Sequence, residues 1–235
     1  MNVKGKTVLV SGSNRGLGKA FVLALLQAGA VKVYAAARDL KELNIPGAHP
    51  VELDITDPVS VAKAAQICAD IDLLVNNAGY LKYGPLLAED SVESLRHHFE
   101  VNTIGTLLMS RAFAPVLAKR GGGAMINILS VLSWLNIPES GPYSASKSAQ
   151  WSLTNGLRNE LREQNTFVMG VHPGYIDTDM AAGVEASKTS PETVVRMTLE
   201  ALGESKEELI IDDAGRWVKS TLSSADAGYL SPVPS

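Results

Sequence analysis

Seven short runs of apolar, often β-branched residues alternate along the chain with segments of helix length, and this order constrains the fold more than any other feature. The runs cover residues 7–10, 32–36, 50–53, 72–75, 124–129, 167–172 and 208–211. Several have no polar alternate face, as is typical of strands that helices cover on both sides. The alternation predicts an α/β fold in which about seven parallel strands form a doubly wound sheet with helices on both faces.

Signals for the starts and ends of helices lie between these runs. The expected helices cover residues 16–28, 58–69, 143–164 and a last segment that Ser190 and Pro191 open. Asp90 and Glu93 resemble a capping box that opens a further helix running to Met109. Because ligands of a doubly wound sheet bind beyond the carboxyl ends of its strands, we expect the chemistry in segments that directly follow strands.

Composition favours one globular domain. The 235 residues are 46% hydrophobic and contain no linker-like stretch, so we expect a single domain, 1–235, with a short substrate-loop region at about 178–203. Lysine and arginine number 21 against 25 aspartate and glutamate, and no basic cluster indicates nucleic acid or a membrane as a partner. The only cysteine, Cys68, has no disulfide partner, and the apolar run after Lys6 is too short for a signal peptide. These features favour a cytoplasmic location.

A glycine-rich loop follows the first apolar run. The segment Ser11-Gly12-Ser13-Asn14-Arg15-Gly16-Leu17-Gly18 contains glycines that allow a tight turn and let backbone N–H groups approach a pyrophosphate. The spacing of Gly12, Gly16 and Gly18 differs from the G-x-G-x-x-G motif of many dinucleotide-binding proteins. By itself, the loop fits either a dinucleotide site or an ordinary turn between a strand and a helix.

Tyr143 and Lys147 lie four positions apart and therefore on one face of the helix expected there. A tyrosine of ordinary pKa, about 10, is ionised to only about one part in a thousand at neutral pH. A nearby cation favours the phenolate, and a pKa lower by two units corresponds to about 2.7 kcal/mol. The pair is a candidate proton donor and acceptor, although an ordinary surface pair has the same spacing.

Four separated segments together resemble the classical short-chain dehydrogenase/reductase family, which has a Rossmann fold. They are residues 11–18, Asn76-Asn77-Ala78-Gly79, Ser130 with Tyr143-x-x-x-Lys147, and Pro173-Gly174, and the resemblance covers about residues 4–178. It implies that the catalytic residues are Asn102, Ser130, Tyr143 and Lys147. Ser133 competes with Ser130, with hydrogen bonding inside its loop as the plainer role, and a satisfied core amide is the alternative for Asn102.

The resemblance also implies a set of residues around a nicotinamide dinucleotide. The set comprises Gly12, Ser13, Asn14, Arg15, Gly16, Leu17, Gly18, Arg38, Asp54, Ile55, Asn77, Ala78, Gly79, Tyr143, Lys147, Pro173, Gly174, Ile176 and Thr178. Asp54 and Ile55 would border the adenine, and Thr178 would reach the nicotinamide carboxamide. His172 is expected to close its strand structurally. The other histidines have no partners at metal-binding spacing, so we expect no metal site.

The choice between NADP(H) and NAD(H) depends on the end of the second strand. Counting from the glycines puts Asp39 where NAD enzymes place a carboxylate for the adenosine ribose. The strand is expected to end near Ala37, however, which makes Arg38 the next residue and leaves Asp39 in the turn. Arg15 offers a second cation to a 2′-phosphate, as in NADP-preferring members of the family. We therefore favour NADP(H), with NAD(H) and a merely solvated strand end as the alternatives.

These features predict an NADP(H)-dependent oxidoreductase that reduces a small apolar or aromatic carbonyl compound, or oxidises the matching alcohol. Tyr143 would act as general acid and base, and Ser130 would hold the substrate oxygen. Lys147 would lower the tyrosine pKa and bind the nicotinamide ribose, while Asn102 would support a water. The expected walls of the substrate pocket are Tyr80, Leu81, Trp134, Leu135, Tyr175 and Met180. Many members of the family are dimers or tetramers, so a homo-oligomer is expected.

Two other readings stay open at this point. A dinucleotide-binding sensor or scaffold without turnover would have the same fold but would not need Tyr143 and Ser130. A sugar-nucleotide epimerase or dehydratase shares the Tyr-x-x-x-Lys pair, yet it usually has a larger C-terminal region than the 57 residues that follow Thr178. The sequence does not indicate a role for residues 214–235.

Overall fold

Residues 1–230 are described by the computed structural model, so residues 231–235 of the expected domain lie outside the described residues. Seven parallel strands form one sheet in the order β3-β2-β1-β4-β5-β6-β7. They are β1 (Thr7–Ser11), β2 (Lys32–Ala37), β3 (His49–Glu52), β4 (Leu73–Asn76), β5 (Ala124–Ile128), β6 (Phe167–His172) and β7 (Glu208–Ile210). The predicted doubly wound parallel sheet is confirmed, and each strand agrees with its apolar run to within one residue at either end.

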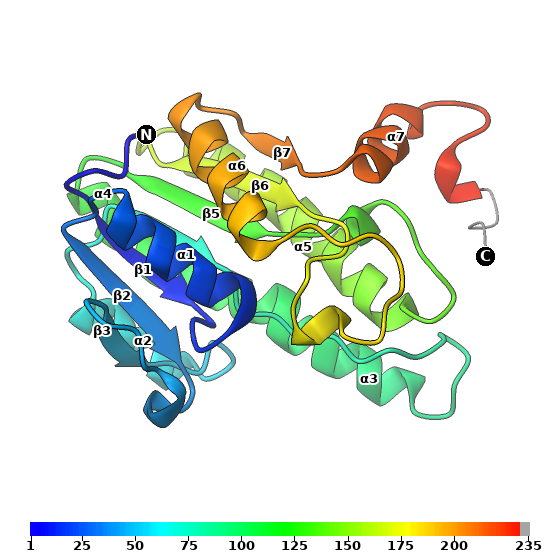
Figure 1. The fold of residues 1–235 in the computed structure, drawn as a ribbon, viewed down its shortest axis with the longest axis horizontal. Helices are drawn as coiled ribbons and strands as arrows, with labels where there is room; N and C mark the ends of the chain where they lie inside the picture. The colour runs from blue at the N-terminus through cyan, green and yellow to red at the C-terminus, as the bar shows by residue number, and fades with distance from the viewer. Residues whose placement is uncertain (231–235) are drawn as a thin grey trace.

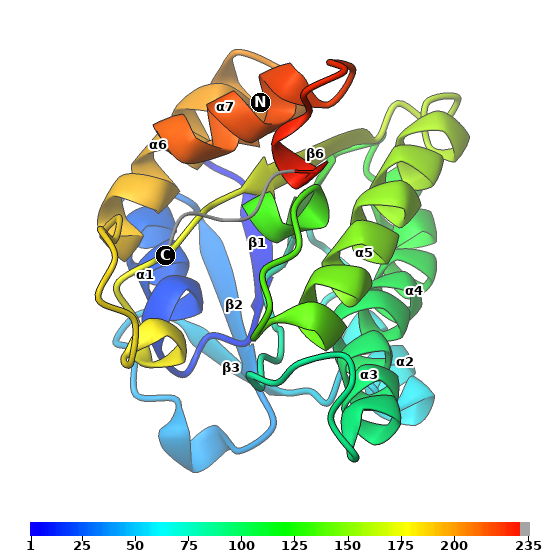
Figure 2. The same ribbon diagram turned by 90° about the vertical axis from the view of Figure 1, so that its right-hand side faces the viewer.

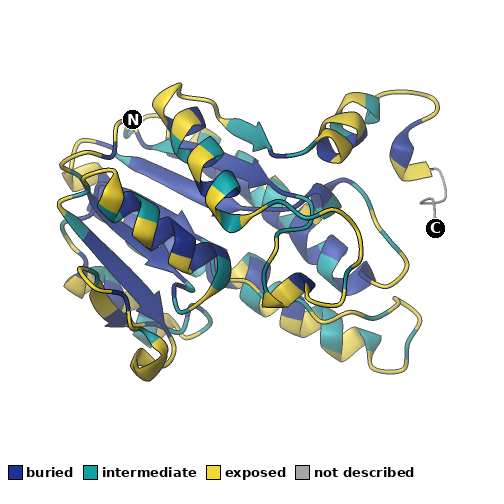
Figure 3. Cartoon of the chain, viewed as in Figure 1, coloured by how far each residue is buried: buried dark blue, intermediate teal, exposed yellow. Residues whose placement is uncertain are grey.

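Helices cover both faces of this sheet (Figure 1, Figure 2). One face carries α1 (Gly16–Gln27) and α6 (Pro191–Gly203), and the other carries α2 (Pro58–Ile67), α4 (Thr106–Lys119) and α5 (Gly141–Glu160). Successive residues of β1 point to opposite faces: Val8 and Val10 join the core under α1, whereas Leu9 joins the core under α4. The central strands are accordingly buried along their whole length (Figure 3).

The sheet order reverses between β1 and β4. The chain runs outward from β1 to β2 and β3 and then returns to place β4 on the other side of β1. At such a switch point the loops after the two strands diverge and leave a crevice for a ligand. Here the glycine-rich loop follows β1 and Asn77 to Gly79 follow β4, so both candidate cofactor segments lie at the crevice.

The long helical run before β5 extends further than expected. It consists of α3 (Ser91–His98), the π-helical turn η2 (Phe99–Gly105) and α4, and it ends at Lys119 rather than Met109. Met109, Phe113 and Leu117 repeat every four residues and are buried against the sheet, which carries the helix onward despite Pro115. By length and composition alone, Ser91–Lys119 is apolar enough to cross a membrane. Its residues Met109, Phe113 and Leu117, however, fill the core under α4.

Two further helix predictions need correction, and one helix was not predicted. The capping box at Asp90 was wrong: its carboxylate accepts a hydrogen bond from Lys82 Nζ at 2.8 Å instead of capping α3. α5 ends at Glu160 rather than Gln164, because a turn follows in which Asn165 takes a φ of 58°. The helix α7 (Asp213–Thr221), capped by Asp212, was not expected, and it follows β7 at the C-terminal end of the sheet (Figure 1).

Candidate active site

The glycine-rich loop passes very close to the loop after β4. Gly12 has a φ of 67°, and a Cβ atom at this position would lie 2.9 Å from the Cα atom of Ala78. A Cβ atom at Gly18 would overlap the carbonyl oxygen of Gly12. Glycine is therefore required at both positions, which leaves backbone rather than side chains at this end of the crevice.

The start of α1 offers backbone donors to an anion. Arg15 is the N-cap residue, and within the described residues 1–230 its side chain makes no capping hydrogen bond. The first N–H groups of α1 thus lack a side-chain acceptor, and the partial positive charge of the helix start favours an anion. A dinucleotide diphosphate fits these donors.

Hydrogen bonds fasten the loop after β4 to the glycine-rich loop. The Ser11 hydroxyl accepts from the backbone N–H groups of Asn77 and Ala78 at 3.0 and 3.1 Å. In return, Asn77 Nδ2 donates to the carbonyl oxygens of Ser11 and Gly12 at 2.9 and 3.1 Å. The two segments that the sequence assigned to the cofactor therefore form one unit, with the Asn77 amide used to join them.

The other loop residues differ in where they point. Ser13 and Leu17 face inward: the Ser13 hydroxyl donates to a β1 carbonyl, and Leu17 lies in the core under α1. Any contact that these two make with a cofactor comes from their backbone. Asn14 and Arg15 face outward, where Asn14 Nδ2 donates to Glu42 at 2.6 Å and Arg15 lies 3.4 Å from Asp179.

Arg38 follows the last residue of β2 directly and is exposed. The Asp39 carboxylate turns to the next backbone segment, where it accepts from Lys41 N at 2.8 Å and caps the turn η1 (Leu40–Glu42). This is the register that the sequence predicted. In the loop after the neighbouring strand β3, the Asp54 carboxylate accepts from the backbone and the hydroxyl of Thr56.

Ile55 is a packing residue. It is buried, and a Cβ atom at Gly105 would lie 2.8 Å from Ile55 Cδ1, so the side chain fills the gap between β3 and the helical run before β5. A contact between Ile55 and an adenine ring would therefore come from its backbone or the edge of its side chain.

Lys147 is a buried cation on α5. Its ammonium donates to the carbonyl oxygen of Ile128 at 2.9 Å and to Gln150 Oε1 at 2.8 Å, and it lies 5.6 Å from the centre of the Tyr143 ring. Burial lowers the pKa of Lys147 from its ordinary value to about 7. A protonated ammonium has three donors, of which these contacts use two.

Tyr143 departs from its expected electrostatics. Burial raises the pKa of the phenol above its ordinary value, and the influence of the nearby Ser130 opposes that rise only in part. The net shift is therefore upward rather than the expected downward one, because burial of the phenol has the largest effect on its pKa. The phenol stays protonated at neutral pH.

Ser130 and Ser133 differ in what they reach. Ser130 follows β5, its hydroxyl accepts from Leu132 N at 3.1 Å, and it lies near enough to Tyr143 to lower the pKa of that phenol. Ser133 is tied into its loop, since its carbonyl accepts from Ser148 at 2.9 Å and its own hydroxyl is buried without a partner in the described chain. The structure thus brings Ser130, not Ser133, to the tyrosine.

Asn102 lies in the π-helical turn η2, a local irregularity that is frequent at functional sites. Its Oδ1 accepts from Tyr80 N at 2.8 Å, and its Nδ2 donates to Tyr80 O and Ser146 Oγ at 3.0 and 2.9 Å. A Cβ atom at Gly79 would lie 3.3 Å from this Oδ1 and 4.0 Å from Lys147 Nζ. Asn102 is thus both a satisfied buried amide and a neighbour of the other candidates.

The segment after β6 borders the glycine-rich loop. A Cβ atom at Gly16 would lie 3.2 Å from the Thr178 methyl group, so the two segments meet there. Gly174 N donates to the Asp212 carboxylate at 2.7 Å, and Ile176 pairs with a later part of its own loop. Of this segment, Thr178 therefore lies directly beside the glycine-rich loop, whereas Gly174 is held by the residue that caps α7.

Sequence reasoning missed two features of this site. Gln150, one helical turn after Lys147, is 1% exposed and joins Lys147 to Thr106, to which its Nε2 donates at 2.9 Å. The (i, i+3) spacing from Lys147 was the available signal. Tyr83 lies close enough to Tyr143 to raise the pKa of that phenol, although burial has the larger effect. No sequence motif identifies Tyr83.

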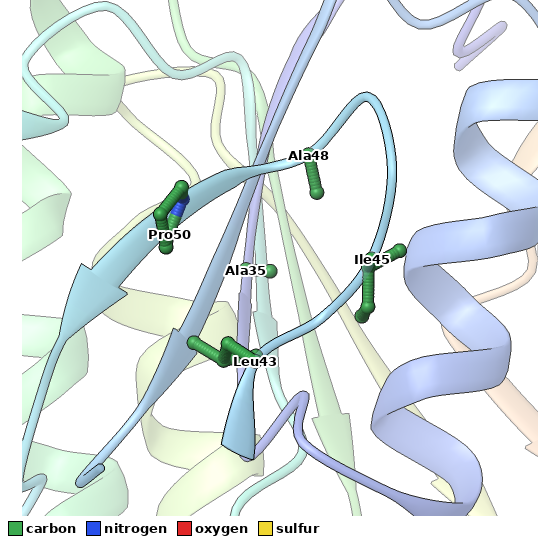
Figure 4. A pocket seen from close by; sticks show the side chains of 5 residues that line it. All are labelled: Ala35, Leu43, Ile45, Ala48 and Pro50. Carbon is green, nitrogen blue, oxygen red and sulfur yellow. The ribbon is translucent and has the colours of Figure 1, made fainter. Parts of the chain in front are cut away.

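The residues expected to line the substrate pocket lie in different environments. Trp134 is a packing residue: it is buried and stacks on His172 with ring centres 3.9 Å apart. Tyr80 packs against His97 and His98, while Met180 is exposed. A small apolar hollow lies elsewhere, between β2 and β3, and is lined by Ala35, Leu43, Ile45, Ala48 and Pro50 (Figure 4). None of its lining residues is a catalytic candidate.

Comparisons with known proteins identify the family. The family model described as short chain dehydrogenase matches residues 6–189. A short chain dehydrogenase from Burkholderia cenocepacia, solved in complex with NADP, superposes with a TM-score of 0.92 at 39% identity, covering 96% of this chain and 95% of that chain. The chain therefore belongs to the short-chain dehydrogenase family, whose members are oxidoreductases that use NAD(P).

Two curated relatives agree with this assignment. The short chain dehydrogenase tazN of Aspergillus terreus is 35% identical over an alignment of 223 residues, which covers 87% of this chain and 48% of the relative. The chain thus spans about half the length of that protein. The NADPH-dependent aldehyde reductase-like protein of Arabidopsis thaliana, described as chloroplastic, is 32% identical, with 96% of this chain and 94% of the relative covered.

Proposed function

We propose that this chain is an NADP(H)-dependent reductase of a small apolar or aromatic carbonyl compound, or the dehydrogenase of the matching alcohol. The joint placement of Tyr143, Ser130 and Lys147 carries the proposal: Ser130 lies near enough to lower the pKa of the phenol, and the ammonium lies 5.6 Å from the centre of the tyrosine ring. A module that only bound a dinucleotide would have no use for the serine and the tyrosine.

The bound dinucleotide supplies the hydride for the carbonyl carbon. Ser130 donates a hydrogen bond to the carbonyl oxygen and holds it at the Tyr143 hydroxyl. Tyr143 gives its proton to that oxygen as negative charge develops there, and its raised pKa keeps the phenol protonated until then. Lys147 binds the nicotinamide ribose with its third donor and stabilises the phenolate that forms. Asn102 supports the water that returns the proton.

Arg38 and Arg15 support NADP(H) rather than NAD(H). Arg38 is the first residue after β2, and Arg15 stands at the start of α1, so both can reach a 2′-phosphate at the adenosine end. The Asp39 carboxylate, which would favour a free ribose hydroxyl, is used in capping a turn. The Burkholderia neighbour is in complex with NADP, and the Arabidopsis relative is named for NADPH.

Two aromatic residues support an apolar or aromatic substrate. Tyr83 lies near enough to Tyr143, and Tyr175 near enough to Tyr83, to raise the pKa of the neighbouring phenol. We further propose that the chain acts as a single domain in a cytoplasmic homo-oligomer, a state that light scattering measures.

The decisive assay follows the absorbance of reduced nicotinamide. A panel of aldehydes, ketones, quinones and alcohols is screened with each dinucleotide, and we expect oxidation of NADPH by an aromatic aldehyde or ketone. Tight NADPH binding without turnover of any compound would favour the sensor. Conversion of a nucleotide sugar without net redox change would favour the epimerase.

A further inference from the structure

A buried polar cluster outside the catalytic residues connects the C-terminal segment to Ser130. His172, the last residue of β6, is fully buried, and its Nδ1 lies 3.0 Å from the carbonyl oxygen of Ser130. Because a carbonyl oxygen only accepts, Nδ1 carries the proton and donates. The other ring nitrogen, Nε2, faces Glu208 Oε1 at 3.4 Å and has no hydrogen-bond partner within residues 1–230. Because a carboxylate oxygen also only accepts, this contact is a hydrogen bond only when Nε2 carries a proton as well.

Glu208, on β7, is an ionised carboxylate held from two further sides. Its Oε2 accepts from Lys219 Nζ of α7 at 2.6 Å, and its Oε1 accepts from the Trp151 indole of α5 at 3.3 Å. Contacts with His172 and Lys219 outweigh burial and lower the pKa of Glu208 to about 2. The carboxylate therefore keeps its charge and presents an acceptor to the Nε2 side of the histidine ring.

Aromatic and apolar contacts also pack His172, Lys219 and α7 against the loop that begins at Ser130. Trp134 stacks on His172, and Lys219 Nζ lies 4.6 Å from the Trp134 ring centre. Val131, Trp134 and Val218 form a small core of their own, so α7 packs directly on the serine loop. Gly215 permits this approach, because a Cβ atom there would lie 2.7 Å from Val131.

We propose that His172 is a positioning residue for Ser130, and that Glu208 and Lys219 of the C-terminal segment orient it. The peptide bond after the serine is then fixed at both of its polar groups: His172 holds the Ser130 carbonyl, and Val131 N donates to Pro173 O at 3.0 Å. The segment whose role the sequence did not indicate thus sets the geometry of the carbonyl-binding hydroxyl. This inference rests on the proposed reductase function.

The test is a double-mutant cycle with Ser130→Ala. Glu208→Gln keeps the shape of the side chain and removes its charge, and Lys219→Met is a milder second variant should the first fold poorly. Glu207→Gln and Lys206→Met are matched controls, since both residues are exposed neighbours that pair elsewhere. Glu208→Gln is expected to lower kcat/KM for the carbonyl compound about tenfold to a hundredfold, with an unchanged Kd for NADPH.

The double-mutant cycle distinguishes a role in positioning Ser130 from a general loss of folding or activity. If His172 acts through Ser130, Glu208→Gln and Lys219→Met have no further effect on kcat/KM in the Ser130→Ala background. Additive losses in that background, or wild-type kcat/KM for both variants, would overturn the inference while leaving the proposed function standing. A wild-type protein that reduces no carbonyl compound would overturn the proposed function and this inference together.

Discussion

Gln150 is predicted to set the pH at which this protein loses affinity for NADPH. Its Oε1 accepts from the Lys147 ammonium at 2.8 Å, and both side chains are buried. A hydrogen bond to a buried charged group is worth about 1.5–3 kcal/mol, and one pKa unit corresponds to about 1.4 kcal/mol. Gln150→Leu should therefore move the Lys147 titration down by about one to two pH units, and Gln150→Glu should move it up.

The lowered pKa of Lys147 determines how the affinity for NADPH changes with pH. As pH rises through about 7, the buried lysine loses its proton, and an anionic dinucleotide loses its cationic partner. The Kd for NADPH should thus begin to rise near neutral pH in the wild-type protein, earlier in Gln150→Leu and later in Gln150→Glu. Calorimetric titration across the pH range measures this. Gln164→Leu, which removes an amide that bonds Ala114 instead, is the control. Superimposable pH profiles for all four proteins would refute the reasoning.

Three further outcomes are expected. Arg38→Ala should raise the KM for NADPH about tenfold or more with little effect on NADH, and equal effects on both would refute the NADP(H) assignment. Ser130→Ala should lower kcat strongly whereas Ser133→Ala should not, so similar losses in steady-state assays would contradict the choice between these serines. Gly18→Ala should lower stability by about 1–3 kcal/mol because its methyl group overlaps the Gly12 carbonyl oxygen; an unchanged melting temperature would show that the loop relaxes freely.

The strands and the cofactor loops could be predicted because their signals are local. Each buried strand is a continuous apolar run, and the segments after β1 and β4 carry glycines and asparagines that the close approach of two backbones requires. The position of Arg38 just beyond β2 also followed from counting along the strand.

What the sequence could not show depends on contacts between distant segments. α7 is stabilised by docking on Val131 and Trp134, about 80 positions earlier in the chain, so its own sequence gave little sign of it. Trp134 was expected at the substrate but stacks on His172. The pKa of Tyr143 depends on how far the fold buries it, which spacing to Lys147 does not reveal.

A single-turnover experiment on Tyr143→Phe tests the central claim most directly. The variant, premixed with NADPH, is combined with a carbonyl substrate that the wild-type protein reduces, and the loss of reduced nicotinamide is followed. We predict a rate about a hundredfold to ten-thousandfold below wild type, with the Kd for NADPH unchanged, because the proton donor is gone. A rate close to wild type at full NADPH occupancy would contradict the assignment of Tyr143 as the acid.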